Sequence, residues 1–146
     1  MLMKFVRSLV TTAGCLVVAM PAFAWDTPQR GSQLRSELMN AVRPYAERDM
    51  GRPVQFVVSE LRYAGNVAFA ILEPQRPGGG TIRWQETRFF AEGDSQDFFD
   101  GLRIDTFLRY QGGRWQVGEY VVGATDVWYA DPALCGVYRA VIPEFC

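Results

Sequence analysis

The chain has 146 residues, of which 49% are hydrophobic and 21% charged, a balance typical of a globular protein and unlike that of disordered or collagen-like chains. It contains no histidine, and Lys4 is its only lysine, so nearly all of its positive charge is arginine. These absences exclude Ser-His-Asp and Cys-His nucleophiles, imidazole zinc sites and, outside the first residues, lysine Schiff bases. Any catalysis would have to use aspartate, glutamate, tyrosine or arginine side chains.

Residues 1–24 have the three-part layout of a secretory signal peptide. Basic Lys4 and Arg7 precede an apolar run, and this run ends in the small-residue pattern AFA at positions 22–24. We therefore expect cleavage before Trp25, which leaves a periplasmic or secreted protein of 122 residues, the 146 of the chain less the first 24. That protein carries 13 arginines and 16 acidic residues, a formal net charge of −3.

Two alternatives to cleavage at this position remain open. Gly14-Cys15 resembles the end of a lipobox, although Thr12 stands where a large aliphatic residue is usual. The apolar run could also anchor an uncleaved chain, but it is shorter than the ~20 residues that a spanning helix needs. We therefore expect no stable membrane span after cleavage of the signal.

The cysteine count agrees with export. Cleavage would remove Cys15 and leave Cys135 and Cys146, an even pair in a compartment that favours disulfides. Gly136 and Pro143 lie between them and allow the chain to double back. We predict a Cys135–Cys146 disulfide that holds the C-terminus, with a stabilisation on the order of 3 kcal/mol in the chain-entropy model.

The periodicity of residues 25–146 predicts one helix followed by strands. Apolar residues recur at helical spacing over 32–50, Ser32 is a suitable N-cap, and Pro44 should bend the helix or end it early. The β-branched and aromatic residues that follow predict five strands separated by glycine-rich turns and loops. These strands span residues 54–63, 67–73, 81–90, 102–110 and 115–122.

One helix followed by hairpin-linked strands predicts a single α+β domain over residues 25–146. The helix is expected to pack on a curved, mainly antiparallel five-stranded meander sheet. This order of elements resembles cystatin-like and nuclear-transport-factor-like folds, in which a sheet grips a helix. The resemblance implies a ligand pocket between helix and sheet, and Trp84, Trp115 and Trp128 are candidates to line it.

Three segments also resemble a group of small exported proteobacterial proteins. They are GRPVQFVVSELR at 51–62, AFAILEPQRPGGG at 68–80 and GGRWQVGEYVVGATDVWY at 112–129. The resemblance covers much of the mature chain and implies export, but it implies no activity.

The five-stranded meander predicts an acidic cluster at one end of the domain. Connections alternate between the two ends of such a sheet, so the helix N-terminus, the loop 91–101 and the exit after Val122 should meet, with Arg30 and Arg35 beside them. This end could bind a cation or an arginine-rich partner, supply a pair of carboxylates for acid–base chemistry, or be a solvated loop with no ligand. The candidate binding residues are Asp94, Asp97, Asp100, Asp126 and Trp128.

The spacing of these carboxylates does not favour a metal. Asp94, Asp97 and Asp100 are three residues apart, whereas a calcium loop needs oxygen ligands at alternate positions. We expect neither a metal nor another cofactor. Nucleic acid is also disfavoured as a partner, because the mature chain is acidic overall and its arginines alternate with acidic residues.

The sequence therefore favours a non-enzymatic binding or interaction module in the periplasm or the medium, with an unknown protein or small molecule as its partner. A small pocket enzyme is one alternative, with Tyr63, Tyr120, Asp105 or Glu119 as the kind of residue that would act. An inhibitor or immunity-type protein, whose loops block a partner enzyme, is the other.

The signal interpretation can be tested directly. Protein recovered from the periplasm or the medium should begin at Trp25, because the cleavage pattern ends at position 24. N-terminal sequencing together with the intact mass checks this. Exported material that still begins at Met1, or that carries lipid on Cys15, would contradict it.

Overall fold

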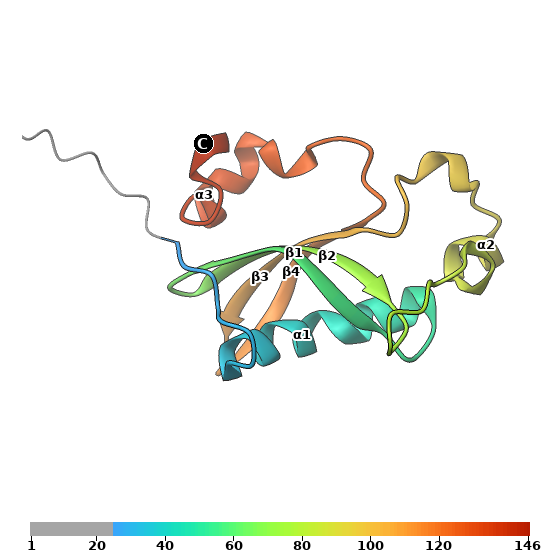
Figure 1. The fold of residues 1–146 in the computed structure, drawn as a ribbon. Helices are drawn as coiled ribbons and strands as arrows, with labels where there is room; N and C mark the ends of the chain where they lie inside the picture. The colour runs from blue at the N-terminus through green and yellow to red at the C-terminus, as the bar shows by residue number, and fades with distance from the viewer. Residues whose placement is uncertain (1–24) are drawn as a thin grey trace, which may run out of the picture.

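The computed structural model describes residues 25–146, so the predicted cleavage site and lipobox region up to Ala24 lie outside the described residues. A four-stranded antiparallel sheet forms the middle layer, in the order β1-β2-β3-β4. Helix α1 packs on one face, and residues 123–146 cover the other (Figure 1). The helix and strands are α1 (Gln33–Met50), β1 (Gln55–Ala64), β2 (Val67–Gln75), β3 (Ile104–Gln111) and β4 (Arg114–Val122).

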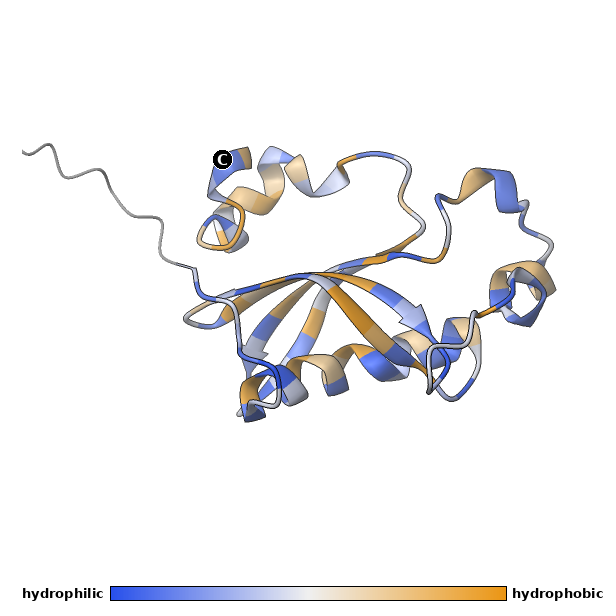
Figure 2. Cartoon of the chain, viewed as in Figure 1, coloured by the Kyte–Doolittle hydropathy of each residue, from blue (hydrophilic) through white to orange (hydrophobic). Residues whose placement is uncertain are grey.

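Helix α1 begins and ends where the sequence predicted. The Ser32 side chain accepts a hydrogen bond from the backbone N–H of Arg35, and Gly51, at φ 74°, follows the last turn. Pro44 lies inside the helix on its exposed side and does not end it. The helix is striped in Figure 2, as expected of one that buries a single face. The residues that it buries are Leu38, Met39, Val42, Ala46, Asp49 and Met50.

The sheet is apolar on both faces, which explains why the β2 sequence reads as an almost continuous apolar run. Ala68, Ala70 and Leu72 pack with the α1 core, whereas Val67 and Phe69 alternate with them and pack on the opposite side. Both faces of this strand are therefore covered.

The second face is covered by the short helices of the C-terminal segment, among them α3 (Cys135–Tyr138). The ring of Tyr138 stacks on Phe107 with centroids 4.3 Å apart. A side chain at Gly118 would collide with the Tyr138 hydroxyl, so this close approach requires glycine in β4. The sulfur atoms of Cys135 and Cys146 lie 2.10 Å apart, at disulfide distance, as predicted.

The strand predicted at residues 81–90, the third in chain order, is wrong, so the sheet has four strands rather than five. Residues 81–90 contain a 3-10 turn (Trp84–Glu86) and the start of α2 (Arg88–Glu92), both within a long excursion between β2 and β3. The side chain of Thr87 accepts a hydrogen bond from Phe90 N–H, and Gly93, at φ 88°, ends the helix. The β-branched and aromatic composition predicted a strand here, but these two helix signals decide the local structure.

The missing strand also changes the predicted arrangement of the two ends. The end of the excursion and the exit after Val122 do meet, as predicted, but not beside the N-terminus of α1. Gln55 of β1 pairs with Gln75 of β2, and Leu72 pairs with Ile104 of β3, so the 76–103 excursion lies where β1 begins. Helix α1 enters β1 at this end, and α2 therefore lies beside the C-terminus of α1 rather than its N-terminus. The acidic segment is thus separated from the helix N-terminus, where Arg30 and Arg35 lie.

Within residues 25–146, no helix is both long and apolar enough to cross a bilayer.

The two-faced core predicts a large effect at Phe107. Phe107→Ala should lower the free energy of unfolding by about 3–5 kcal/mol, because its fully buried ring fills the space under Tyr138. Phe98→Ala, in the excursion with 78% of the residue exposed, is the matched control and should change stability by less than about 0.5 kcal/mol. Urea unfolding followed by fluorescence measures both. Equal effects would contradict the packing of residues 123–146 on the sheet.

Candidate functional site

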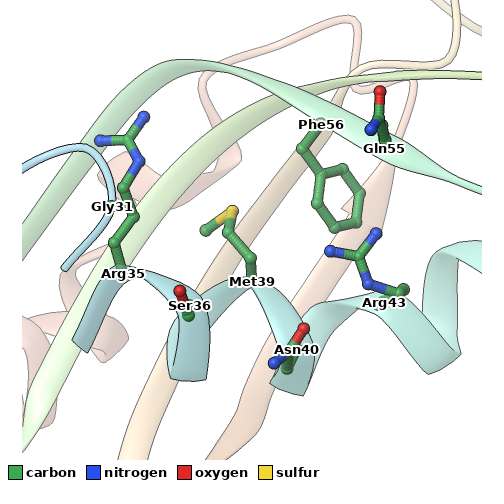
Figure 3. Close-up of a pocket in the computed structure, with 8 residues that line it drawn as sticks. All are labelled: Gly31, Arg35, Ser36, Met39, Asn40, Arg43, Gln55 and Phe56. Carbon is green, nitrogen blue, oxygen red and sulfur yellow. The ribbon is translucent and has the colours of Figure 1, made fainter. Parts of the chain in front are cut away.

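A basic groove runs between α1 and the edge strand β1. Its volume is about 630 Å³, and its walls come from both elements (Figure 3). A second cavity of about 440 Å³ overlaps it and extends the groove toward Val58. Arg35, Met39 and Phe56 line both cavities. The groove arises because α1 lies closest to β4, where Tyr45 contacts Tyr120 with ring centroids 5.5 Å apart, and leaves the β1 side open.

Three arginines give the groove its charge. Arg35 and Arg43 project from α1, and Arg30 lies in the turn that leads into the helix. Within residues 25–146 none of the three forms a salt bridge, and the residues that line the groove include no acid. The groove therefore carries uncompensated positive charge on a chain whose net charge is negative.

The arginines are positioned by contacts to backbone and aromatic groups. Arg35 donates to the carbonyl of Pro28 over 3.1 Å, and Arg43 donates to the carbonyl of Val54. The guanidinium of Arg43 also lies 5.4 Å from the centre of the Phe56 ring, a cation–π geometry. Each guanidinium keeps further N–H donors for a ligand, because arginine carries five.

Met39 and Phe56 form an apolar floor between the two guanidinium groups. Figure 3 shows the Met39 side chain between Arg35 and Arg43, with the Phe56 ring facing Arg43. Charged groups beside an apolar surface suit a ligand that is anionic and partly apolar rather than a small hydrated ion.

The residues predicted as an acidic site do not gather around a pocket. Asp94 and Asp97 lie exposed in the excursion, and Asp126 is exposed beyond β4; none of the three forms a salt bridge within the described part of the chain. Asp100 lies 3.9 Å from Arg103, and its N–H donates to the carbonyl of Gly123. Their role in binding stays a prediction.

Trp128, the remaining predicted binding residue, has a structural contact. Its indole N–H donates to Asp105 over 3.3 Å, and Arg103 donates to the same carboxylate over 2.9 Å. Asp105 is fully buried in β3. This hydrogen-bonded ion pair fastens the start of the C-terminal segment to the sheet and leaves no carboxylate atom facing solvent.

The tryptophans expected in one helix–sheet pocket lie in three places. Trp115 packs in the core under α1, and Trp128 packs on the opposite face of the sheet. Trp84 stacks with Phe89 at 6.0 Å and contacts Phe99 at 4.9 Å, in the excursion. The expectation that these three tryptophans line one pocket is therefore wrong, and none of them lines the groove between α1 and β1.

Among the residues suggested for an enzyme, Tyr120 has the most unusual surroundings. It lies under the C-terminal half of α1 beside Asp49, which is 1% exposed and paired with Arg48 and Arg88. Burial first, and then the Asp49 carboxylate, raise the pKa of Tyr120 far above its ordinary value of 10. This hydroxyl is therefore held neutral and closed off rather than activated.

Within residues 25–146, no three acidic or cysteine side chains come together in a way that could hold a metal ion. Comparisons with protein-family models, with curated proteins and with solved structures found no match to this chain. The groove must therefore be interpreted from its own chemistry.

The surroundings of Tyr120 predict an alkaline loss of stability. A group whose pKa is raised by folding stabilises the protein fully below its unfolded pKa, and this stabilisation is lost progressively as the pH rises from the unfolded toward the folded pKa. Between pH 8 and pH 11 the wild type should lose about 1 kcal/mol more unfolding free energy than Tyr120→Phe. Urea unfolding at the two pH values measures this difference, and an equal loss in both proteins would contradict it.

Proposed function

We propose that this protein is a non-enzymatic binding module, periplasmic or secreted, and that its ligand site is the groove between α1 and β1. The ligand is anionic, because the groove offers three guanidinium groups without acidic partners. It also has an apolar part that covers Met39 and Phe56.

The observation that carries this proposal is the unequal pairing of the arginines. Seven of the 13 arginines in residues 25–146 form salt bridges, and three of the remaining six lie together in this one groove. Because unpaired charges in a partly desolvated groove are stabilised by a counter-charge, the grouping favours an anion as ligand. The seven paired arginines are Arg48, Arg52, Arg62, Arg76, Arg83, Arg88 and Arg103.

The proposed location rests on the signal-like residues 1–24 and on the cysteine pair. Sulfur atoms at disulfide distance between Cys135 and Cys146 are compatible with an oxidising compartment. A bond here would close the end of the C-terminal segment into a loop and hold it against the sheet.

A relation to cystatin-like proteins also belongs to this proposal. One helix on an antiparallel sheet supports it, whereas the C-terminal segment on the second face goes beyond the arrangement expected from the sequence. The proposed function does not depend on this relation, because a fold alone does not determine what a protein binds.

The inhibitor or immunity-type alternative has one observation in its favour. The excursion exposes two aromatic side chains, Phe90 at 50% and Phe98 at 78%, next to the carboxylates of Asp94 and Asp97. Exposed aromatic residues are enriched in protein interfaces. On this alternative the excursion, rather than the groove, would contact the partner.

The proposal is tested with hexaglutamate as an anionic probe and hexalysine as its reversed-charge control. Titrated into the ¹⁵N-labelled protein at low salt, hexaglutamate should shift the Nε signals of Arg30, Arg35 and Arg43, and hexalysine should not. The double variant Arg35→Gln/Arg43→Gln should bind hexaglutamate about tenfold more weakly, because each exposed ion pair contributes up to about 1 kcal/mol.

Arg109→Gln/Arg114→Gln provides the matched control, since it removes the same charge from β3 and β4 outside the groove. It should bind hexaglutamate nearly as well as the wild type. Equal losses in the two double variants, or hexalysine shifts centred on Asp94 and Asp97 without any hexaglutamate shift in the groove, would contradict the proposal.

A further inference from the structure

The outer edge of β1 faces the groove with backbone groups that are not used in the sheet. Pro74 of β2 lies opposite Phe56 and has no N–H, so these two residues form a non-hydrogen-bonded pair. The N–H and C=O of Phe56 therefore point outward, and by alternation so do those of Val58. The carbonyl of Val54 follows the same alternation and accepts a hydrogen bond from Arg43 in the groove.

The other end of this edge already pairs with an extended segment. Asp26 and Tyr63 exchange two antiparallel backbone hydrogen bonds, each 2.9 Å long. The chain then turns through Pro28 and Gly31 into α1. No other residue of the described chain pairs with the outer edge of β1, so it stays open beside Phe56 and Val58.

We propose that the groove binds an extended acidic segment of a partner protein, which adds to the outer edge of β1 as a fifth strand. This rests on the proposed function, since it identifies the anionic ligand of the same groove. Strand addition supplies main-chain hydrogen bonds, and the side chains of the groove supply selectivity.

The arginine spacing specifies a pattern in the peptide. Arg35, Met39 and Arg43 are four residues apart along α1, so their positions rise by about 6 Å each along the helix axis. Same-face residues of a strand are about 6.8 Å apart. An added strand therefore places its residues i, i+2 and i+4 opposite these three side chains. The matching pattern is acidic at i, apolar at i+2 and acidic at i+4.

Charge disfavours two other occupants. Residues 1–24 contain Lys4 and Arg7 and no acidic residue, so the chain's own N-terminal segment would be repelled. A second copy pairing through β1 would bring two sets of three arginines together across a two-fold axis, which costs free energy in the same way.

The test uses two acetylated, amidated heptapeptides of identical composition. TETVTET carries glutamates at i and i+4 with valine between them on one face, and TETVETT moves the second glutamate to the opposite face. TETVTET should bind at least about tenfold more tightly by NMR titration, a difference of about 1.4 kcal/mol. It should also slow amide hydrogen exchange at Phe56 and Val58.

Two N-methylated forms of TETVTET separate strand addition from charge attraction. One form is methylated on the backbone nitrogens of the even-numbered residues, and the other on those of the odd-numbered residues. Only the nitrogens that face β1 donate hydrogen bonds in an added strand, so one form should lose at least about tenfold in affinity and the other should bind as TETVTET does.

The outcomes distinguish this inference from the proposed function. If hexaglutamate still shifts the groove arginines but all four heptapeptides bind alike, strand addition is wrong and an anionic ligand is still supported. If neither hexaglutamate nor any heptapeptide binds in the groove, both proposals fail. Exchange protection of Phe56 and Val58 in the protein alone, rising with its concentration, would show a second copy on this edge and overturn the inference.

Discussion

The molecule depends on the burial of both faces of one small sheet. Helix α1 covers one face and residues 123–146 cover the other, so the central strands are buried along most of their length and expose side chains only near their ends. Phe69 and Phe107, the largest fully buried side chains, belong to the second face. Because both faces are occupied, a partner can reach the sheet only at its edges or at the loops of its two ends.

The two edges are not equivalent. Helix α1 lies against β4 through contacts such as Tyr45 on Tyr120, which closes the space on that side. The same displacement opens the space along β1, where the arginine side of α1 faces the free strand edge. The position of α1 on the sheet thus produces both the packed contact with β4 and the groove beside β1. The buried Asp49 pairs with Arg48 of α1 and with Arg88 of α2, both of which are more exposed, and so joins α2 to the end of α1.

The sequence allowed most of the fold to be predicted, and the failures have a local cause. Periodicity located α1 and four strands to within two residues at their ends, and the cysteine count predicted the pairing of Cys135 with Cys146. The prediction of a strand at residues 81–90 was wrong because it gave more weight to the aromatic and β-branched composition than to the helix N-cap at Thr87 and the helix end at Gly93. Because one extra strand reverses the end of the sheet at which each later connection lies, that single error placed the acidic segment at the wrong end of α1 in the prediction.

The groove could not have been predicted in the same way. Arg35 and Arg43 both fall within the helix that the sequence predicts, but whether an arginine is paired depends on distant residues, as for Arg62 with Glu144 and Arg88 with Asp49. The unpaired arginines of the groove also determine at what distance an anionic ligand is attracted. Residues 25–146 carry a formal net charge of −3 and therefore repel anions at long range, and salt screens that repulsion beyond about 8 Å. An anion is therefore selected only at contact distance, inside the groove, which favours a shape-matched ligand over an unstructured polyanion.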